Sequence, residues 1–478
     1  MTFRHSLAVT VLALGLTATG CDTVDNVEPR QSVTPEQALN SVEGFEAILI
    51  SSYDALQAED YYGQQFMLVP DALADNITVP NSTSNRYPGF STNAIGSHLN
   101  RWGGHYVSIN EMNLVLSRID ALEVEATNPQ AVRNRIKGEA KFLRALNYFD
   151  LVRTKAYEPG REVNGFTEGV IIREQPTEDV ANADFRARSS NAAVYDLVVG
   201  DLQEAVSLLT GNSRGSINFA TAAAANALLA RVELYRGNWA AAESAAQAAI
   251  DASGRQIVDA SASSAPLVTA FAATSHPESI FEIVNAASQD GAVTNANASL
   301  QSLTDPFRGG FFDAAATRSL VNAHEAGDAR LDLYENVTFG GEALTYITKY
   351  VGAVAQDVDP VPVFRVSEMY LILAEARAEQ NNPGGALTAL NALRSRRGLS
   401  GLSGISGTDI VAAVLRERRV ELAFEGHRFF DLKRRGLPIP KPQITATTVI
   451  PYADFRVLAR IPEDQVSNNA LLVQNPGY

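Results

Sequence analysis

Residues 218–253 contain two alanine-rich stretches separated by a Gly-Asn pair, and read NFATAAAANALLARVELYRGNWAAAESAAQAAIDAS. Alanine has the highest helix propensity, and its small side chain lets two helices approach closely. The same arrangement recurs over residues 363–399, with a break from Asn381 to Gly385, and a weaker third copy occupies residues 191–211. Helix–turn–helix units of this kind are typical of tetratricopeptide repeats. Because the copies are irregularly spaced, we expect helical hairpins within a larger, mostly all-α fold.

Other stretches also show the apolar period of amphipathic helices. In residues 35–57, 98–122 and 128–157, apolar side chains recur at steps of three and four residues. Two loop-rich insertions interrupt this pattern, at about residues 60–97 and 253–352. The second insertion includes the strand-like pieces SIFEIV and LTYITKYV. Loops carry binding residues more often than the scaffold does, so we expect a ligand site on these insertions.

The length allows two or three average domains or one large one, and we predict a single domain over residues 38–478. We place its N-terminal half at about 38–250 and its C-terminal half at about 251–478. The Pro-rich stretch over residues 436–466 is expected to end the fold without a helix.

Composition excludes several classes of protein. The chain has 478 residues and a net charge of −15, which argues against nucleic acid as a partner. It has one cysteine, so it forms no internal disulfide and holds no cysteine-ligated zinc or iron–sulfur cluster.

The N-terminus has the layout of a secretory signal. MTFRHSLAVTVLALGLTATGC combines a basic start, a short apolar run and small residues that lead to Cys21. We predict a lipoprotein signal peptide over residues 1–20 and acylation of Cys21; ordinary cleavage beside an incidental cysteine is the alternative. Residues 21–37 are polar and are predicted to be a flexible tether. The protein would then be attached to a membrane outside the cytoplasm.

The enzyme signatures that can be tested in the sequence are missing. The chain has no phosphate-binding P-loop, no dinucleotide-binding glycine pattern and no nucleophile elbow. Its histidines are scattered and form no zinc pair. We therefore predict no catalytic residues, no metal and no cofactor, although a surface glycoside hydrolase stays a weakly supported alternative.

One stretch, EGHRFFDLKRRG over residues 425–436, looks like an active site. On a helix, His427 and Asp431 would lie on one face, four residues apart. However, the surrounding residues 416–436 read as one helix with interleaved glutamates and arginines, a basic last turn and a capping Gly436. We interpret the motif as an ion-paired helix that closes the core, and not as a catalytic dyad.

Several segments resemble the SusD/RagB family of nutrient-uptake lipoproteins. ERRVELAFEGHRFFDLKRRG resembles the family's C-terminal hallmark, and IKGEAKFLRALNYFDLV resembles its N-terminal hallmark. PVPVFRVSEMYLILAEARAEQNN and the chain ending RIPEDQVSNNALLVQNPGY are similar to two further family segments. The matches lie in the family's order and cover residues 40–478. The loop at residues 156–176 is longer than in most members and altered in sequence.

The resemblance implies a SusD-like fold built on tetratricopeptide-type hairpins. It also implies a partner, a SusC-type TonB-dependent barrel in the outer membrane, over which this chain would be a hinged, lipid-anchored lid that faces the cell exterior. The ligand would be an oligosaccharide, and the chain itself would catalyse nothing. A peptide-binding lid and a helical-repeat scaffold for envelope assembly are the alternatives.

The ligand-binding residues are predicted from composition alone, since aromatic faces and nearby polar groups suit sugars. The two loops that combine these features supply the candidates Asn85, Arg86, Tyr87, Phe90, Phe307, Arg308, Phe311 and Phe312. Alternatively, these aromatic side chains pin their own loops to the core. Trp102 and Tyr106 begin a predicted helix and are expected to be core residues.

Overall fold

The computed structural model describes residues 39–81, 86–179, 184–285, 298–307, 310–352, 355–442, 444–445 and 447–478. The predicted signal peptide and tether, with Cys21, lie outside the described residues, as do Asn85 and Arg308. The expectations for these residues, and the division of the chain into halves, stay predictions.

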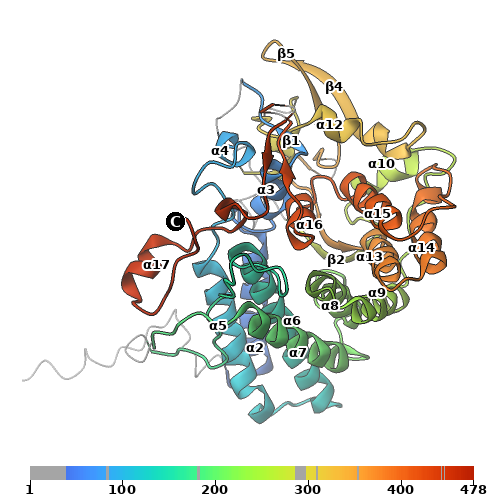
Figure 1. Ribbon diagram of the computed structural model, residues 1–478. Helices are drawn as coiled ribbons and strands as arrows, with labels where there is room; N and C mark the ends of the chain where they lie inside the picture. Colours follow the sequence, from blue (N-terminus) through green and yellow to red (C-terminus); the bar gives the residue numbers. More distant parts are fainter. Residues whose placement is uncertain are drawn as a thin grey trace, which may run out of the picture.

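The fold is mostly helical, as the sequence predicts (Figure 1). The helices of the N-terminal half are α2 (Val42–Asp54), α3 (Gln65–Leu73), α4 (Pro88–Ser91), α5 (Gly103–Arg118), α6 (Pro129–Lys155), α7 (Asn191–Leu209), α8 (Ala222–Arg236) and α9 (Trp239–Ser253). Those of the C-terminal half are α10 (Ala265–Phe271), α11 (Leu300–Thr304), α12 (Arg318–Val321), α13 (Val366–Glu379), α14 (Pro383–Arg396), α15 (Thr408–Glu421), α16 (Arg428–Arg434) and α17 (Glu463–Asn468).

The predicted helical hairpins are present. Helices α8 and α9 pack on each other, and the turn between them is made by Gly237 with a positive φ of 70°. Helix α13 packs against both α9 and α14, so the two hairpins lie side by side (Figure 1). Two details of the prediction are wrong: α14 begins at Pro383, so Gly385 is helical, and residues 191–209 form the single helix α7, which packs on α6.

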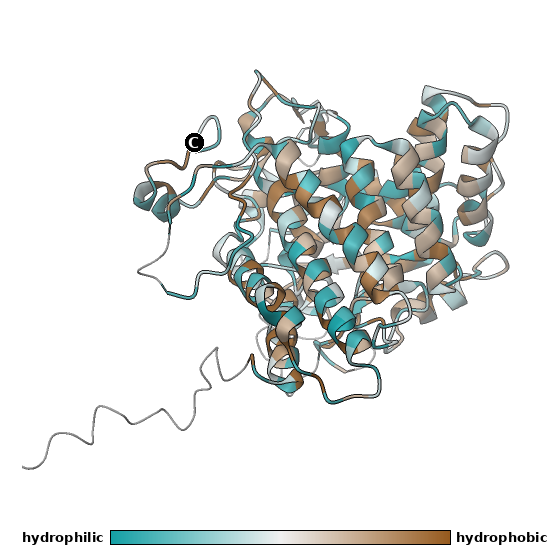
Figure 2. Cartoon of the chain, turned by 90° about the horizontal axis from the view of Figure 1, so that it is seen from below, coloured by the Kyte–Doolittle hydropathy of each residue, from teal (hydrophilic) through white to brown (hydrophobic). Residues whose placement is uncertain are grey.

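Small and large apolar residues on these helices share one core. Seen from below, the helices carry hydrophobic and hydrophilic surfaces side by side (Figure 2). The alanines of α8 and α9 that face the core are fully or almost fully buried, which permits the close helix packing. A buried ion pair, in which Arg231 on α8 donates at 2.8 and 2.7 Å to Glu368 on α13, joins the two hairpins.

Short strands connect the two loop-rich insertions. The four-stranded sheet has the order β1 (Ile77–Thr78), β3 (Ala315–Ala316), β5 (Glu342–Ile347) and β4 (Tyr334–Phe339), with antiparallel neighbours. Two further antiparallel pairs are β2 (Ser279–Ile283) with β6 (Val361–Arg365), and β7 (Ile439–Pro440) with β8 (Val449–Ile450). The two strand-like pieces in the sequence correspond to β2 and β5. Because β1 pairs with β3, the first insertion lies beside the second.

The single helix predicted over residues 416–436 is wrong. Helix α15 ends at Glu421 and α16 begins at Arg428, because Phe424 and Gly426 have positive φ values of 62° and 78°. A Cβ atom at Gly426 would lie 2.0 Å from the carbonyl oxygen of Phe66, so only glycine fits there.

One prediction for the C-terminal region is confirmed and another is wrong. Gly436 has a φ of 64° directly after α16, as expected of a helix-ending glycine. The fold does not end without a helix, because α17 forms within the C-terminal segment.

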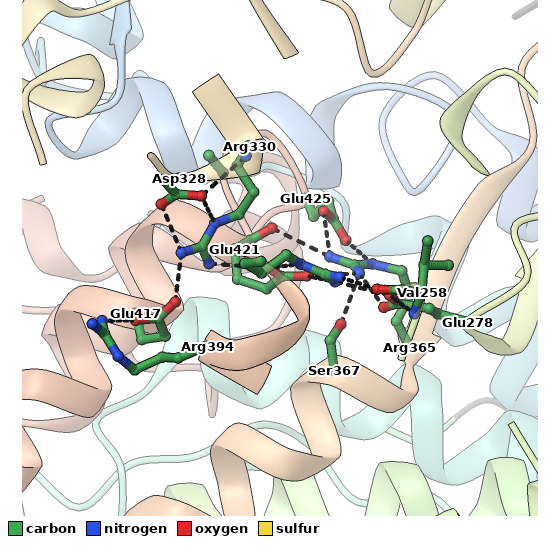
Figure 3. Close-up of polar contacts among 12 residues, drawn as sticks. Val258, Glu278, Asp328, Arg330, Arg365, Ser367, Arg394, Glu417, Glu421 and Glu425 are labelled. Atoms are coloured by element: carbon green, nitrogen blue, oxygen red, sulfur yellow. Dashed lines mark hydrogen bonds and ion pairs between the residues drawn. The ribbon is translucent and has the colours of Figure 1, made fainter. Parts of the chain in front are cut away.

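The ion pairs predicted for this motif are present and buried (Figure 3). Glu421 accepts hydrogen bonds from Arg397 at 2.8 and 3.0 Å, and from Arg365 and Arg330 at 3.1 Å each. Glu425 is held by Arg365 at 2.8 Å. Every member of this ionic network therefore faces an opposite charge, which buried charges require. Its members are Glu278, Asp328, Arg330, Lys349, Arg365, Arg394, Arg397, Glu417, Glu421 and Glu425.

Candidate ligand-binding site

The two loops that contain the predicted ligand-binding residues meet at the four-stranded sheet. The guanidinium carbon of Arg86 lies 4.5 Å from the centre of the Phe311 ring. The Nε atom of Arg86 is also 3.9 Å from a carboxylate oxygen of Asp313, which is buried. Arg86 and Phe311 are both half-buried. The structure thus brings together one residue from each loop as a stacked, partly exposed pair.

Phe307 gives this surface its most exposed aromatic ring. Its side chain is 65% exposed, and its ring centre lies 5.5 Å from that of Tyr346 on β5. The Tyr346 hydroxyl donates a 2.6 Å hydrogen bond to Glu335, which holds the tyrosine ring in place. The backbone N–H of Phe307 donates to Asp305 at 2.7 Å. A flat apolar face is therefore presented to solvent from a fixed backbone position.

The other aromatic candidates hold the loops. Tyr87 is buried and packs edge-on against half-buried Phe90, at 5.5 Å between ring centres. Phe312 is fully buried between Phe339 and Tyr346, at 5.2 and 6.5 Å. Tyr87 and Phe312 therefore pin their own loops to the core, which is the alternative to ligand binding for these side chains. Their burial removes these two from the exposed surface.

The backbone of the second loop is fixed to α11. The N–H groups of Phe311 and Phe312 both donate to the carbonyl oxygen of Ser302, at 2.9 and 3.0 Å. A Cβ atom at Gly310 would lie 2.4 Å from this same oxygen, so the glycine permits the close approach. Pre-formed surfaces lose less conformational entropy when a ligand binds.

Chemically, the surface of Arg86, Phe307 and Phe311 suits a ligand that has both apolar faces and hydroxyl groups. The aromatic rings can stack against C–H surfaces, and the guanidinium group offers hydrogen-bond donors. We name this surface the loop site. Tyr346 was not among the predicted residues, yet it supports Phe307 from strand β5, 39 positions later in the chain. The signal in the sequence for the strand that presents Tyr346 was the alternation of apolar and polar residues around LTYITKYV.

The motif at residues 425–436 offers no catalytic pair. The Asp431 carboxylate accepts hydrogen bonds from Arg418 at 2.9 and 3.0 Å and from Arg434 at 2.9 Å. His427 is buried, and its Nδ1 atom is 4.0 Å from Glu368. Burial lowers the pKa of each histidine in the described ranges, so all are neutral near pH 7: His98, His105, His276, His324 and His427. His98, His105, His276 and His427 are buried, and His324 is half-buried.

The described residues include no group of three or more His, Cys, Asp and Glu side chains that could hold a metal ion. Among the helices of this described part, none is long and apolar enough to cross a membrane.

Two family models and a curated relative match this chain. Residues 345–478 match the SusD family, and residues 27–234 match a SusD-like family described as "Starch-binding associating with outer membrane". SusD-like protein P2 of Formosa agariphila is 24% identical, over 98% of this chain and 99% of that protein.

Solved structures share the fold over nearly the whole chain. A putative sugar-binding protein from Bacteroides vulgatus is 25% identical, with a TM-score of 0.79 over 92% of this chain and 99% of its own. A laminarin-binding SusD-like protein is 22% identical, with a TM-score of 0.71 over 92% of this chain and 100% of its own. Together, the two family matches, the full-length relative and the shared fold show that this chain belongs to the SusD/RagB family of non-catalytic, outer-membrane-associated binding proteins.

Proposed function

We propose that this protein binds oligosaccharides at the cell surface and acts as the lid of a SusC-type TonB-dependent transporter. The family description names starch binding and outer-membrane association, and the Bacteroides vulgatus relative is described as a putative sugar-binding protein. A lid captures the ligand and delivers it to the barrel beneath, so it needs a binding surface and a tether but no catalytic groups.

The observation that carries this proposal is the loop site. Arg86 stacks on Phe311 across two separate insertions, and Phe307 lies in the same loop as Phe311. Phe307 leaves most of its ring in water, so this ring is accessible to a ligand. We assign the ligand contacts to these three residues.

Attachment to the membrane is proposed through acylated Cys21. One acyl chain binds a membrane only weakly, whereas several chains on one residue give stable attachment. In cells that express Cys21→Ser, we expect the protein to leave the membrane fraction. If this variant stays with the membrane as the parent does, the anchor is elsewhere.

The ligand is tested by titrating the purified protein with laminarin oligosaccharides, maltooligosaccharides and mixed peptides in a calorimeter. We expect a saccharide to bind, and Phe307→Ala to weaken it about tenfold, equivalent to about 1.4 kcal/mol. Ile50→Ala is the matched control, because Ile50 is an exposed apolar side chain (43%) on α2, outside the loop site. Binding of peptides alone would favour the peptide-lid alternative and contradict the proposal.

A further inference from the structure

A second cavity lies away from the loop site and shares no residue with it. Its volume is about 450 Å³, and it is formed by α5, α17 and residues from 171–177 and 184–185, which lie between α6 and α7 in the chain. Helices α5 and α17 are neighbours at the lower left of Figure 1, whereas β4 and β5, beside the loop site, are at the top. A volume of this size is within the range of small-molecule sites in proteins.

Aromatic side chains make up much of its wall. Trp102 and Tyr106 lie at 5.1 Å between ring centres, with their planes inclined by 53°. Trp102 is buried, as the sequence predicts, but Tyr106 is only half-buried and both line the cavity. Phe185 and Val107 also line it and are 65% and 62% exposed. Large apolar side chains that are exposed around a cavity point to a binding site.

Hydrogen bonds fix the cavity wall. The Tyr106 hydroxyl donates to the carbonyl oxygen of Ile171 at 2.9 Å. The Asn110 amide holds Thr177 from both sides, accepting from its N–H at 2.7 Å and donating to its carbonyl at 3.1 Å. The loop segment is therefore fastened to α5 at two points, and the cavity exists before a ligand arrives.

The polar groups of the cavity are mainly acceptors or neutral amides. Glu111 and Asp184 supply carboxylates, and Gln465 and Asn468 supply amides from α17. Among the described lining residues one is a cation, Arg173, which is paired with Asp184 at 2.5 Å; Asp184 also pairs with Arg186 beside the cavity. These two carboxylates and two guanidinium groups balance, so the cavity has no excess charge that would attract an ionic ligand.

We propose that this cavity is a second saccharide-binding site, specific for neutral sugars. Sugar hydroxyl groups would form hydrogen bonds with the amides of Gln465 and Asn468, and the C–H face of a sugar ring would stack on the aromatic wall. An apolar side chain of a protein partner fits less well, since it would strip water from these two amides without replacing their hydrogen bonds. That the ligand is a saccharide rests on the proposed function, whereas the existence of the cavity is seen from its lining residues.

The site has its own fluorescent reporter. The chain contains two tryptophans, Trp102 in this cavity and Trp239 at the start of α9. In full-length Trp239→Phe protein, the tryptophan fluorescence comes from Trp102 alone. We expect laminarin oligosaccharides or maltooligosaccharides to change this fluorescence along a saturable curve.

Variants separate the two sites. In the Trp239→Phe background, Phe185→Ala and Asn468→Ala, both at exposed positions, should each weaken the saccharide-dependent change about tenfold. The control Phe307→Ala, in the loop site, should leave it unaltered.

Three results would overturn the inference. If saccharides bind by calorimetry but never change Trp102 fluorescence, the second site is absent while the proposed function stands. If no saccharide binds by either method, both fail. If the fluorescence responds only to a purified membrane partner, the cavity is a docking surface.

Discussion

Replacing Glu421 with alanine is the sharpest test of the buried ionic network. Glu421 is 3% exposed and accepts hydrogen bonds from Arg330, Arg365 and Arg397. In Glu421→Ala the five cations of the network would keep their positive charges in the core but face only four of its carboxylates, those of Glu278, Asp328, Glu417 and Glu425.

The expected loss follows from the cost of an unpaired buried charge. Removal of one partner from a buried ion pair costs about 3–5 kcal/mol. For 478 residues, unfolding entropy at about 2.1 cal/mol/K per residue amounts to about 1 kcal/mol/K. The melting temperature of Glu421→Ala should therefore fall by roughly 3–5 °C.

The assay is differential scanning calorimetry of the purified protein without ligand. The matched control is Glu463→Ala, which removes an exposed pair with Arg460, whose side chains are 69% and 40% exposed. Exposed pairs contribute about 0–1 kcal/mol, so the control should shift the melting temperature by about 1 °C or less. Equal shifts in the two variants would refute the claim that the network stabilises the fold.

Three further predictions concern stability. Burial would raise the pKa of Glu278, but two buried arginines lower it to about 2. Because this pKa is below the unfolded value, the stability that ionised Glu278 gives to the fold is present above about pH 4.5 and is lost as the pH falls toward 2. Acid titration of the circular dichroism signal checks this. Gly426→Ala should cost at least about 2 kcal/mol in urea unfolding, because a positive φ and a clash coincide, whereas Gly200→Ala, in a helix with open space around it, should not destabilise. Thr221→Ala should lower the free energy of unfolding by about 1 kcal/mol in the same assay, because the Thr221 hydroxyl caps α8 by accepting from the N–H of Ala224. Thr221→Ser should keep most of this stability, and an alanine variant as stable as the parent would contradict the prediction.

Local sequence signals predicted most of the helices. The alanine-rich stretches around Gly237 gave α8 and α9, since helix propensity and a helix-ending glycine act over a few residues. The start of α14 had a local signal too: Asn382 caps the helix and Pro383 is its first residue. The predicted break extended across Gly385, which lies in the first turn of α14.

The break between α15 and α16 could not be predicted from local pattern. Glutamates recur every four residues through Glu425, as in a continuous helix. The cause is a distant contact, the approach of the Phe66 carbonyl to Gly426, and the chain between these two residues spans almost the whole fold. Tertiary contacts of this kind override local propensity.

The candidate site was predicted only at the level of loops. Composition selected two loops that the structure brings together through the contact of Arg86 with Phe311; their role in ligand binding stays a prediction. Composition could not separate exposed Phe307 from buried Phe312, because burial of Phe312 depends on Phe339 of β4. Tyr106 was expected in the core, yet it lines a cavity whose wall also includes Ile171, more than 60 residues later in the chain.

The central claim is that this chain is the lid of a transporter. It is tested most directly by purifying the tagged, full-length protein in mild detergent from the membranes of the organism that makes it, and by identifying what accompanies it. The account predicts a large TonB-dependent barrel in a nearly equimolar amount. Envelope-assembly proteins in place of a barrel would contradict the lid function and favour the scaffold alternative.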